Sequence, residues 1–78
     1  MKLTSPQIGV LSQLTNIRKS DVSIHHQRLW YYRYTYGGSR QLDWLNANIC
    51  NALVRKGVLV PVEGSDTEHR LNLEGVEL

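Results

Sequence analysis

Hydrophobic positions at helical spacing predict a first helix near residues 6–15. Ser5 offers a side-chain acceptor to the free amides of a first turn, and Pro6 needs no amide partner there, so we place the helix cap at Ser5. The turn-forming and charged residues 16–21 end the pattern and predict a loop. The side chains that recur on one side of this helix are Ile8, Leu11 and Leu14.

A second helix is predicted over residues 46–56, and its two sides differ in character. Asn46 is a good N-cap, and Gly57 supplies the left-handed residue that commonly ends a helix. We expect the hydrophobic side to face the core and the polar side to be available to a partner. The hydrophobic side consists of Ile49, Cys50, Leu53 and Val54. The polar side consists of Asn48, Asn51 and Arg55.

The aromatic residues 29–36 and the Gly37-Gly38 pair after them favour a strand that leads into a turn. A helix over residues 23–34 is the competing interpretation. In a strand, alternate residues share a side. One side would then hold Trp30, Tyr32, Tyr34 and Tyr36, and the other Tyr31, Arg33 and Thr35.

Residues 58–62 and about 69–73 predict an antiparallel hairpin after the second helix. The predicted core combines residues from these elements: Leu3, Ile8, Leu11, Leu14, Ile49, Leu53, Val54, Leu59 and Leu71. A chain of this length forms one small domain, which we assign to residues 1–78.

Three short motifs resemble parts of a winged helix-turn-helix domain of the small bacterial and phage type. They are the opening Leu3–Gln7, the helix end and hydrophobic pair at Asn51–Leu59, and the segment Leu71–Gly75. The resemblance implies an α+β domain with an N-terminal helix, a second helix and a C-terminal hairpin, to which the residues themselves add a central aromatic strand. It also implies a DNA-binding regulator. In such domains another helix precedes the recognition helix, and only residues 39–45 leave room for it here.

Charge is distributed unevenly along the chain. Residues 1–57 hold eight Lys and Arg against two Asp, a net charge of +6, whereas residues 58–78 hold one Arg against five Asp and Glu, a net charge of −4. Phosphate groups are attracted to the first part and repelled by the second. Nucleic acid would therefore approach the first part of the chain.

Duplex DNA is the first predicted partner. Asn can bond adenine and Arg can bond guanine in a major groove, so the polar side of the second helix suits a recognition helix, although it equally suits a solvated surface. A homodimer is expected under this hypothesis, because one short helix contacts few bases. The candidate nucleic-acid contacts are Asn48, Asn51, Arg55, Lys56, Arg18 and Lys19.

A protein partner is the alternative prediction, as for a phage or mobile-element inhibitor. Trp, Tyr and Arg are enriched where proteins bind each other, and they also form stacking platforms for single-stranded nucleic acid, which we rank behind protein here. The hairpin connection is acidic, which is unusual for a wing that contacts phosphate. The candidate protein contacts are Arg28, Trp30, Tyr32, Arg33, Tyr34, Glu63, Asp66 and Glu68.

Catalytic and cofactor chemistry has no support in the sequence. No phosphate loop, paired carboxylates or nucleophile with a base at a meaningful spacing is present, so we expect no enzyme and no cofactor. His25, His26 and His69 lack further ligands at metal-binding spacing, so no metal is expected, and Cys50 is expected to be a buried apolar residue. With no membrane span or signal peptide, a cytoplasmic location is expected.

Overall fold

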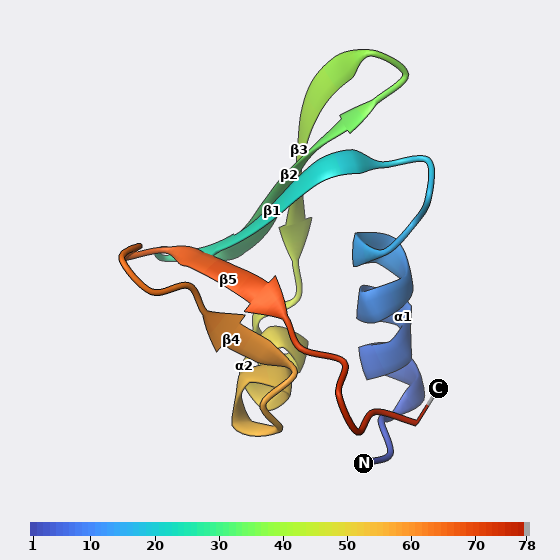
Figure 1. Cartoon of the computed structure of the whole chain (residues 1–78), viewed down its shortest axis with the longest axis vertical. Helices are drawn as coiled ribbons and strands as arrows, with labels where there is room; N and C mark the ends of the chain where they lie inside the picture. The colour runs from blue at the N-terminus through green and yellow to red at the C-terminus, as the bar shows by residue number, and fades with distance from the viewer. Residues whose placement is uncertain (78) are drawn as a thin grey trace.

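Two helices and a five-stranded antiparallel sheet make up residues 1–77, which the computed structural model describes (Figure 1). The α+β class predicted from the sequence is confirmed. In chain order the elements are α1 (Ser5–Leu14), β1 (Ser20–His26), β2 (Trp30–Tyr36), β3 (Ser39–Leu45), α2 (Ala47–Arg55), β4 (Leu59–Pro61) and β5 (Glu68–Leu71).

The strand order in the sheet is β3-β2-β1-β5-β4, so β3 and β4 are the two edges. β1, β2 and β3 form a meander, and β5 joins β1 to the C-terminal hairpin. The turn end of the β2–β3 hairpin projects beyond both helices (Figure 1). A parallel bridge between Lys2 and Glu77 holds the beginning of the chain beside its end.

The cap of α1 lies one residue before the predicted position. Thr4, rather than Ser5, accepts a hydrogen bond from the Gln7 amide, and the Gln7 side chain accepts one from the Thr4 amide. This reciprocal capping box satisfies two free donors at once, which a cap at Ser5 without such a partner would not do. Pro6 remains in the first turn, where its missing amide is harmless.

The predicted second helix is confirmed as α2. Asn46 caps it by accepting from the Ile49 amide at 3.1 Å, and Gly57 follows it with a φ of 75°. Its buried stripe is narrower than expected, because Cys50 and Leu53 are buried whereas Val54 is exposed. In α1, Ile8 is likewise exposed, and Gln7, Val10, Leu11 and Leu14 are the buried side chains. The predicted core positions at Ile8 and Val54 are therefore wrong.

Residues 30–36 form a strand, as predicted, and the competing helix over residues 23–34 is wrong. Gly37 and Gly38 make a two-residue turn with φ values of 58° and 80°, which suits a tight hairpin. Residues 39–45, the only room for a further helix before α2, are strand β3 and pair with β2 along their whole length. A strand therefore lies where a winged helix-turn-helix domain would place its second helix.

The C-terminal hairpin is confirmed with shorter strands than predicted. β4 and β5 pair from Leu59 with Leu71 to Pro61 with His69. Hydrogen bonds from the Val62 amide and to the Val58 carbonyl extend the pairing slightly beyond both ends.

The core lies between the helices and one side of the β1–β2–β3 meander. Trp30, Tyr32 and Tyr34 alternate on this side of β2, as predicted, and all three are buried. Their polar atoms have partners: the Trp30 indole donates to Asn51 at 3.0 Å, and the Tyr34 hydroxyl donates to Asp43 at 2.6 Å. The other buried apolar residues are Leu3, Val10, Leu11, Leu14, Ile24, Leu45, Cys50, Leu53, Val58 and Leu59, with Ile49 and Leu71 partly buried against them.

Candidate functional site

The side of the meander that points away from the core carries a continuous row of aromatic rings. Strand register places His25 of β1 opposite Tyr31 of β2, and Tyr31 opposite Trp44 of β3. Residues directly opposite each other share a side of the sheet. The next row on the same side holds Ser23, Arg33 and Leu42. We call this side the outer face and define it by Ser23, His25, Tyr31, Arg33, Leu42 and Trp44.

Large apolar side chains of the outer face and the adjoining turn are open to solvent. Trp44 is 63% exposed, and Leu29 in the β1–β2 turn is 55% exposed. The Trp44 ring approaches the Tyr31 ring edge-on, with the ring centroids 5.9 Å apart and the planes at 71°. Contiguous exposed apolar groups of this kind mark interaction sites on folded proteins more often than isolated ones do.

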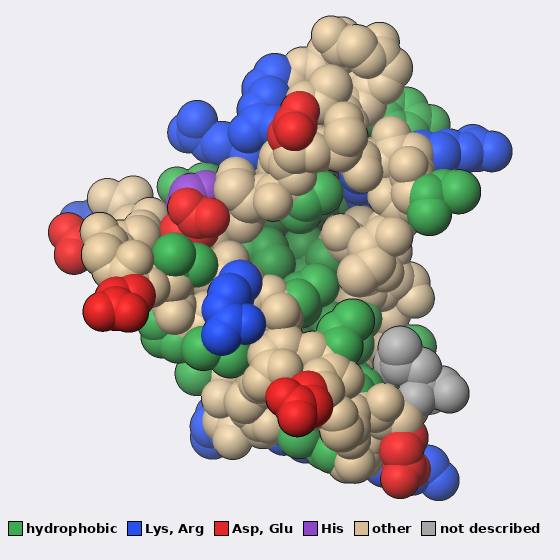
Figure 2. All heavy atoms as spheres, in the orientation of Figure 1, with side chains coloured by type: hydrophobic (Ala, Val, Ile, Leu, Met, Phe, Trp, Pro, Cys, Tyr) green, Lys and Arg blue, Asp and Glu red, His purple; other side chains and the backbone are tan. Residues whose placement is uncertain are grey.

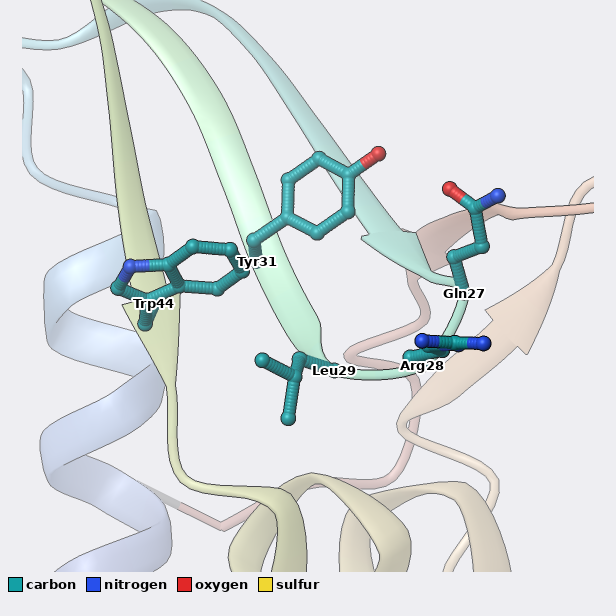
Figure 3. Close-up of a pocket in the computed structure, with 5 residues that line it drawn as sticks. All are labelled: Gln27, Arg28, Leu29, Tyr31 and Trp44. Carbon is teal, nitrogen blue, oxygen red and sulfur yellow. The ribbon is translucent and has the colours of Figure 1, made fainter.

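These side chains surround an open hollow of about 370 Å³, which is lined by Gln27, Arg28, Leu29, Tyr31 and Trp44. Figure 3 shows the Trp44 and Tyr31 rings on one side, Leu29 at the base and Arg28 with Gln27 on the other side. Arg28 is the charged residue among those lining the hollow. The hollow therefore combines apolar walls with a cation at its rim.

His25 is held in place on the outer face by hydroxyl groups. Its ring nitrogens lie 3.2 Å from the Thr67 Oγ1 and 3.1 Å from the Ser23 Oγ, and its ring stacks on Tyr31 at 5.2 Å between centroids. Burial lowers the pKa of His25 below its ordinary 6.5; nearby Glu68 opposes this effect, and the positive charge of Arg33 adds to it. The neutral form of the His25 ring is thus favoured. The same ring covers one face of Tyr31.

Charged side chains of both signs lie on the face that Figure 2 shows. Acidic side chains gather at the β4–β5 side of the molecule, and Lys and Arg side chains lie both there and near the meander above it. Glu63 and Asp66 are exposed in the β4–β5 turn, and Glu68 lies on β5 opposite His25. Arg33 is exposed on β2, and Arg40 of β3 donates to the Asp21 carbonyl at 2.9 Å.

Half of the residues predicted to contact nucleic acid make contacts within the domain instead. The Asn51 side-chain oxygen accepts from Trp30, and the Lys56 Nζ donates to Gln7 at 2.8 Å. The Lys19 Nζ donates to the Tyr32 hydroxyl at 2.6 Å and lies over the Tyr32 and Tyr34 rings. The other three, Arg18, Asn48 and Arg55, are exposed.

The predicted protein contacts are also divided. Trp30, Tyr32 and Tyr34 are core residues and cannot serve as exposed anchors without unfolding, so that part of the prediction is corrected. Their side of β2 packs on the helices because the helices supply the apolar surface that these rings bury. Arg28 and Arg33 remain accessible beside the hollow.

Sequence reasoning missed the most exposed ring of the site, Trp44. A signal for it was present, because a two-residue turn at Gly37-Gly38 fixes the register of the returning strand and sets residue 44 opposite residue 31. Leu29 and Leu42 were also missed, because the strand that pairs with β2 was not assigned from the sequence.

Other kinds of site find little support within residues 1–77. No group of three or more potential metal ligands lies together in that part of the chain. Cys50 is fully buried, and burial raises the pKa of its thiol to about 11, which disfavours the reactive thiolate. Among the same residues, no helix has the length and apolar character to cross a bilayer.

Comparison of the chain with protein-family models, with curated proteins and with solved structures finds no match. The geometry of the outer face and the hollow is therefore the basis on which we infer function.

Proposed function

We propose that this domain is a non-catalytic protein-binding module and that the hollow beside Trp44 receives an apolar side chain of its partner. The observation that carries the proposal is the 63% exposure of Trp44 next to Leu29 and Tyr31 around one hollow. Tryptophan is one of the residue types that are enriched among the anchors of protein interfaces.

Ring orientation favours a protein over single-stranded nucleic acid as the partner. Successive bases stack on aromatic faces that are open to solvent. Here His25 covers one face of Tyr31, and Trp44 meets Tyr31 at 71° rather than side by side with it. Exposed Leu29 and Leu42 add aliphatic surface, which suits an apolar side chain better than a base.

The internal contacts of Asn51, Lys19 and Lys56 weigh against duplex DNA as the main partner. A groove contact by Asn51 would compete with its bond from the Trp30 indole. Arg18, Asn48 and Arg55 remain free for a regulator of the winged-helix type, which we rank second.

The chemistry of the partner follows from the charges that flank the hollow. Arg28 lines it, and Arg33 lies two residues along β2 from Tyr31 on the same face. Carboxylates on both sides of an apolar side chain would complement these two cations. We therefore propose a partner segment with one large apolar residue between acidic residues.

The test is a titration of isotope-labelled protein with a short peptide that carries one central Phe flanked by Asp and Glu. Replacing Trp44 by Ala should weaken binding by about tenfold or more, because anchors contribute a large share of interface energy. The matched control is Tyr36→Ala, since Tyr36 is 45% exposed but lies on the opposite side of β2. Its affinity should change by less than about twofold.

Two further peptides separate the apolar and ionic parts of the proposal. A peptide with Ser in place of Phe, and one with Lys in place of each acidic residue, should both bind far more weakly. Equal binding by all three peptides, or an unchanged affinity of the Trp44→Ala variant, would contradict the proposal.

A further inference from the structure

The two edges of the sheet differ sharply in how they resist pairing with another chain. β4 has only three residues and ends with Pro61, which has no amide to donate. β3 has seven residues without proline, and its pairing with β2 continues from Ser39 to Leu45 without a bulge. Short strands, proline, bulges and charged side chains are the usual protections of an edge, and of these β3 has only the charges of Arg40 and Asp43. β3 therefore offers a long, regular edge with free backbone groups.

The tight turn determines which backbone groups of β3 face outward. In a hairpin with a two-residue turn, the residues flanking the turn exchange hydrogen bonds, and this pattern repeats at every second residue. Ser39, Gln41, Asp43 and Leu45 then bond to β2. The amides and carbonyls of Arg40, Leu42 and Trp44 point away from the sheet.

We propose that β3 pairs antiparallel with β3 of a second copy of this chain, with Leu42 on the two-fold axis. This register sets Leu42 opposite Leu42 of the partner and sets Arg40 opposite Trp44 of the partner. Each of the three residues whose amide and carbonyl point away from the sheet then lies opposite a residue of the same kind, as an antiparallel ladder requires. A register shifted by one residue would instead place them opposite residues whose amide and carbonyl are already bonded to β2.

Side chains on both sides of the joined strands are complementary in this register. On the outer face, Leu42 contacts its own copy, and the Trp44 ring lies opposite Arg40 of the second copy, whose guanidinium reaches back across β2 to the Asp21 carbonyl. On the other side, Gln41 lies opposite Asp43. Asp43 uses its Oδ2 to accept from Tyr34, which leaves Oδ1 for the Gln41 amide.

The dimer would join the two sheets into one and place two hollows on a continuous outer face. A single pair of strands buries less surface than a stable dimer normally does, so self-association should be weak and concentration-dependent. Leu42 and Trp44 belong to both surfaces, but the dimer proposal does not rest on the proposed partner, because it is argued from the backbone edge of β3.

Opposite charges at the two-fold axis provide the test, with sedimentation velocity as the measurement. Leu42→Lys and Leu42→Glu should each raise the dimer dissociation constant about tenfold, because like charges then face each other. An equal mixture of the two variants should dimerise again as a Lys–Glu pair. The matched control is Leu73→Lys, since Leu73 is 40% exposed and Leu42 is 41% exposed; it should leave the dissociation constant unchanged.

Hydrogen exchange on the native protein gives a second readout that does not depend on variants. Raising the protein concentration should slow exchange at the amides of Arg40, Leu42 and Trp44 and leave Gln41 and Asp43 unchanged. A native protein that stays monomeric up to millimolar concentration overturns the proposal. The proposal is also overturned if Leu42→Lys and Leu42→Glu both dimerise as well as the native protein, or if a mixture of these two folded variants stays monomeric.

Discussion

Asn48 and Asn51 lie one turn apart on the polar side of α2, yet their environments differ. Both side chains are exposed, but the Asn51 oxygen also accepts from the indole of the buried Trp30. Lys19 shows the same principle, because its ammonium group bonds to Tyr32 instead of facing solvent. Whether a polar side chain on an amphipathic helix stabilises the fold or is available to a partner therefore depends on whether a core residue next to it needs a hydrogen bond.

Comparison of two asparagine variants tests this difference. Asn51→Ala should lower the free energy of unfolding by about 1–3 kcal/mol, because it leaves a buried indole N–H without an acceptor. Asn48→Ala should change it by less than about 0.5 kcal/mol, as is usual for exposed positions. Urea denaturation measures both, and equal effects would show that the Trp30–Asn51 bond contributes nothing.

His25 predicts a pH dependence of stability. Its pKa in the folded protein lies below the ordinary 6.5, so the unfolded chain binds protons more readily at this residue. The contribution is fully present above pH 6.5 and is lost as pH falls through the lower pKa of the folded state. Unfolding free energies measured from neutral pH downward should fall less steeply for His25→Gln than for the native protein. Parallel curves for the two proteins would contradict the assignment.

Among the elements, those with a one-sided hydrophobic pattern were predictable from the sequence, and those without one were not. α2 and β2 each bury one side, so their patterns indicated both their type and their orientation. β3 is mostly exposed on both sides and has no such pattern. β1 has a bulge near Asp21, whose φ is 51°, and this irregularity obscures the alternation along the strand. The outer face depends on both strands, so the sequence carried a signal for the Tyr31–Trp44 pair, through the Gly37-Gly38 turn, but not for the part of the face on β1.

Two glycine variants test the hairpin that sets the register of the outer face. Gly38 has a φ of 80°, so Gly38→Ala should destabilise the domain by about 1 kcal/mol through backbone strain. Gly9 lies inside α1 with open space around its position, so Gly9→Ala should stabilise by about 0.5–1 kcal/mol through helix propensity. Thermal unfolding checks both, and a Gly38→Ala variant as stable as the native protein would contradict the turn geometry.

At the scale of the whole molecule, the two sides of one sheet have separate roles. The inner side packs against the helices around Trp30 and Tyr32, and the opposite side leaves Trp44 and its neighbours in solvent. An antiparallel sheet that is covered on one side usually has a polar exposed side. Here the exposed side keeps rings and aliphatic groups, which is the feature that the proposed function explains.

Opposing charges reinforce this arrangement. Glu63 and Asp66 are exposed in the β4–β5 turn, and Arg33 is exposed on β2. The proposed acidic partner would be repelled by the turn and attracted by Arg33. Replacing Glu63 and Asp66 by Gln and Asn should speed association of the acidic peptide at low salt and make its rate fall more steeply as salt is added, as stopped-flow fluorescence can measure. A slower association would show that the carboxylates attract the partner.

The central claim is that binding occurs at the outer face and not on α2. The most direct test records amide chemical shifts of the isotope-labelled protein during three separate titrations, with the acidic Phe peptide, duplex DNA and a single-stranded oligonucleotide. We expect the peptide to shift residues 27–31 and 42–44 at the lowest concentration of the three ligands. Shifts that begin with duplex DNA at Asn48 and Arg55, while Trp44 stays unchanged with every ligand, would contradict the claim.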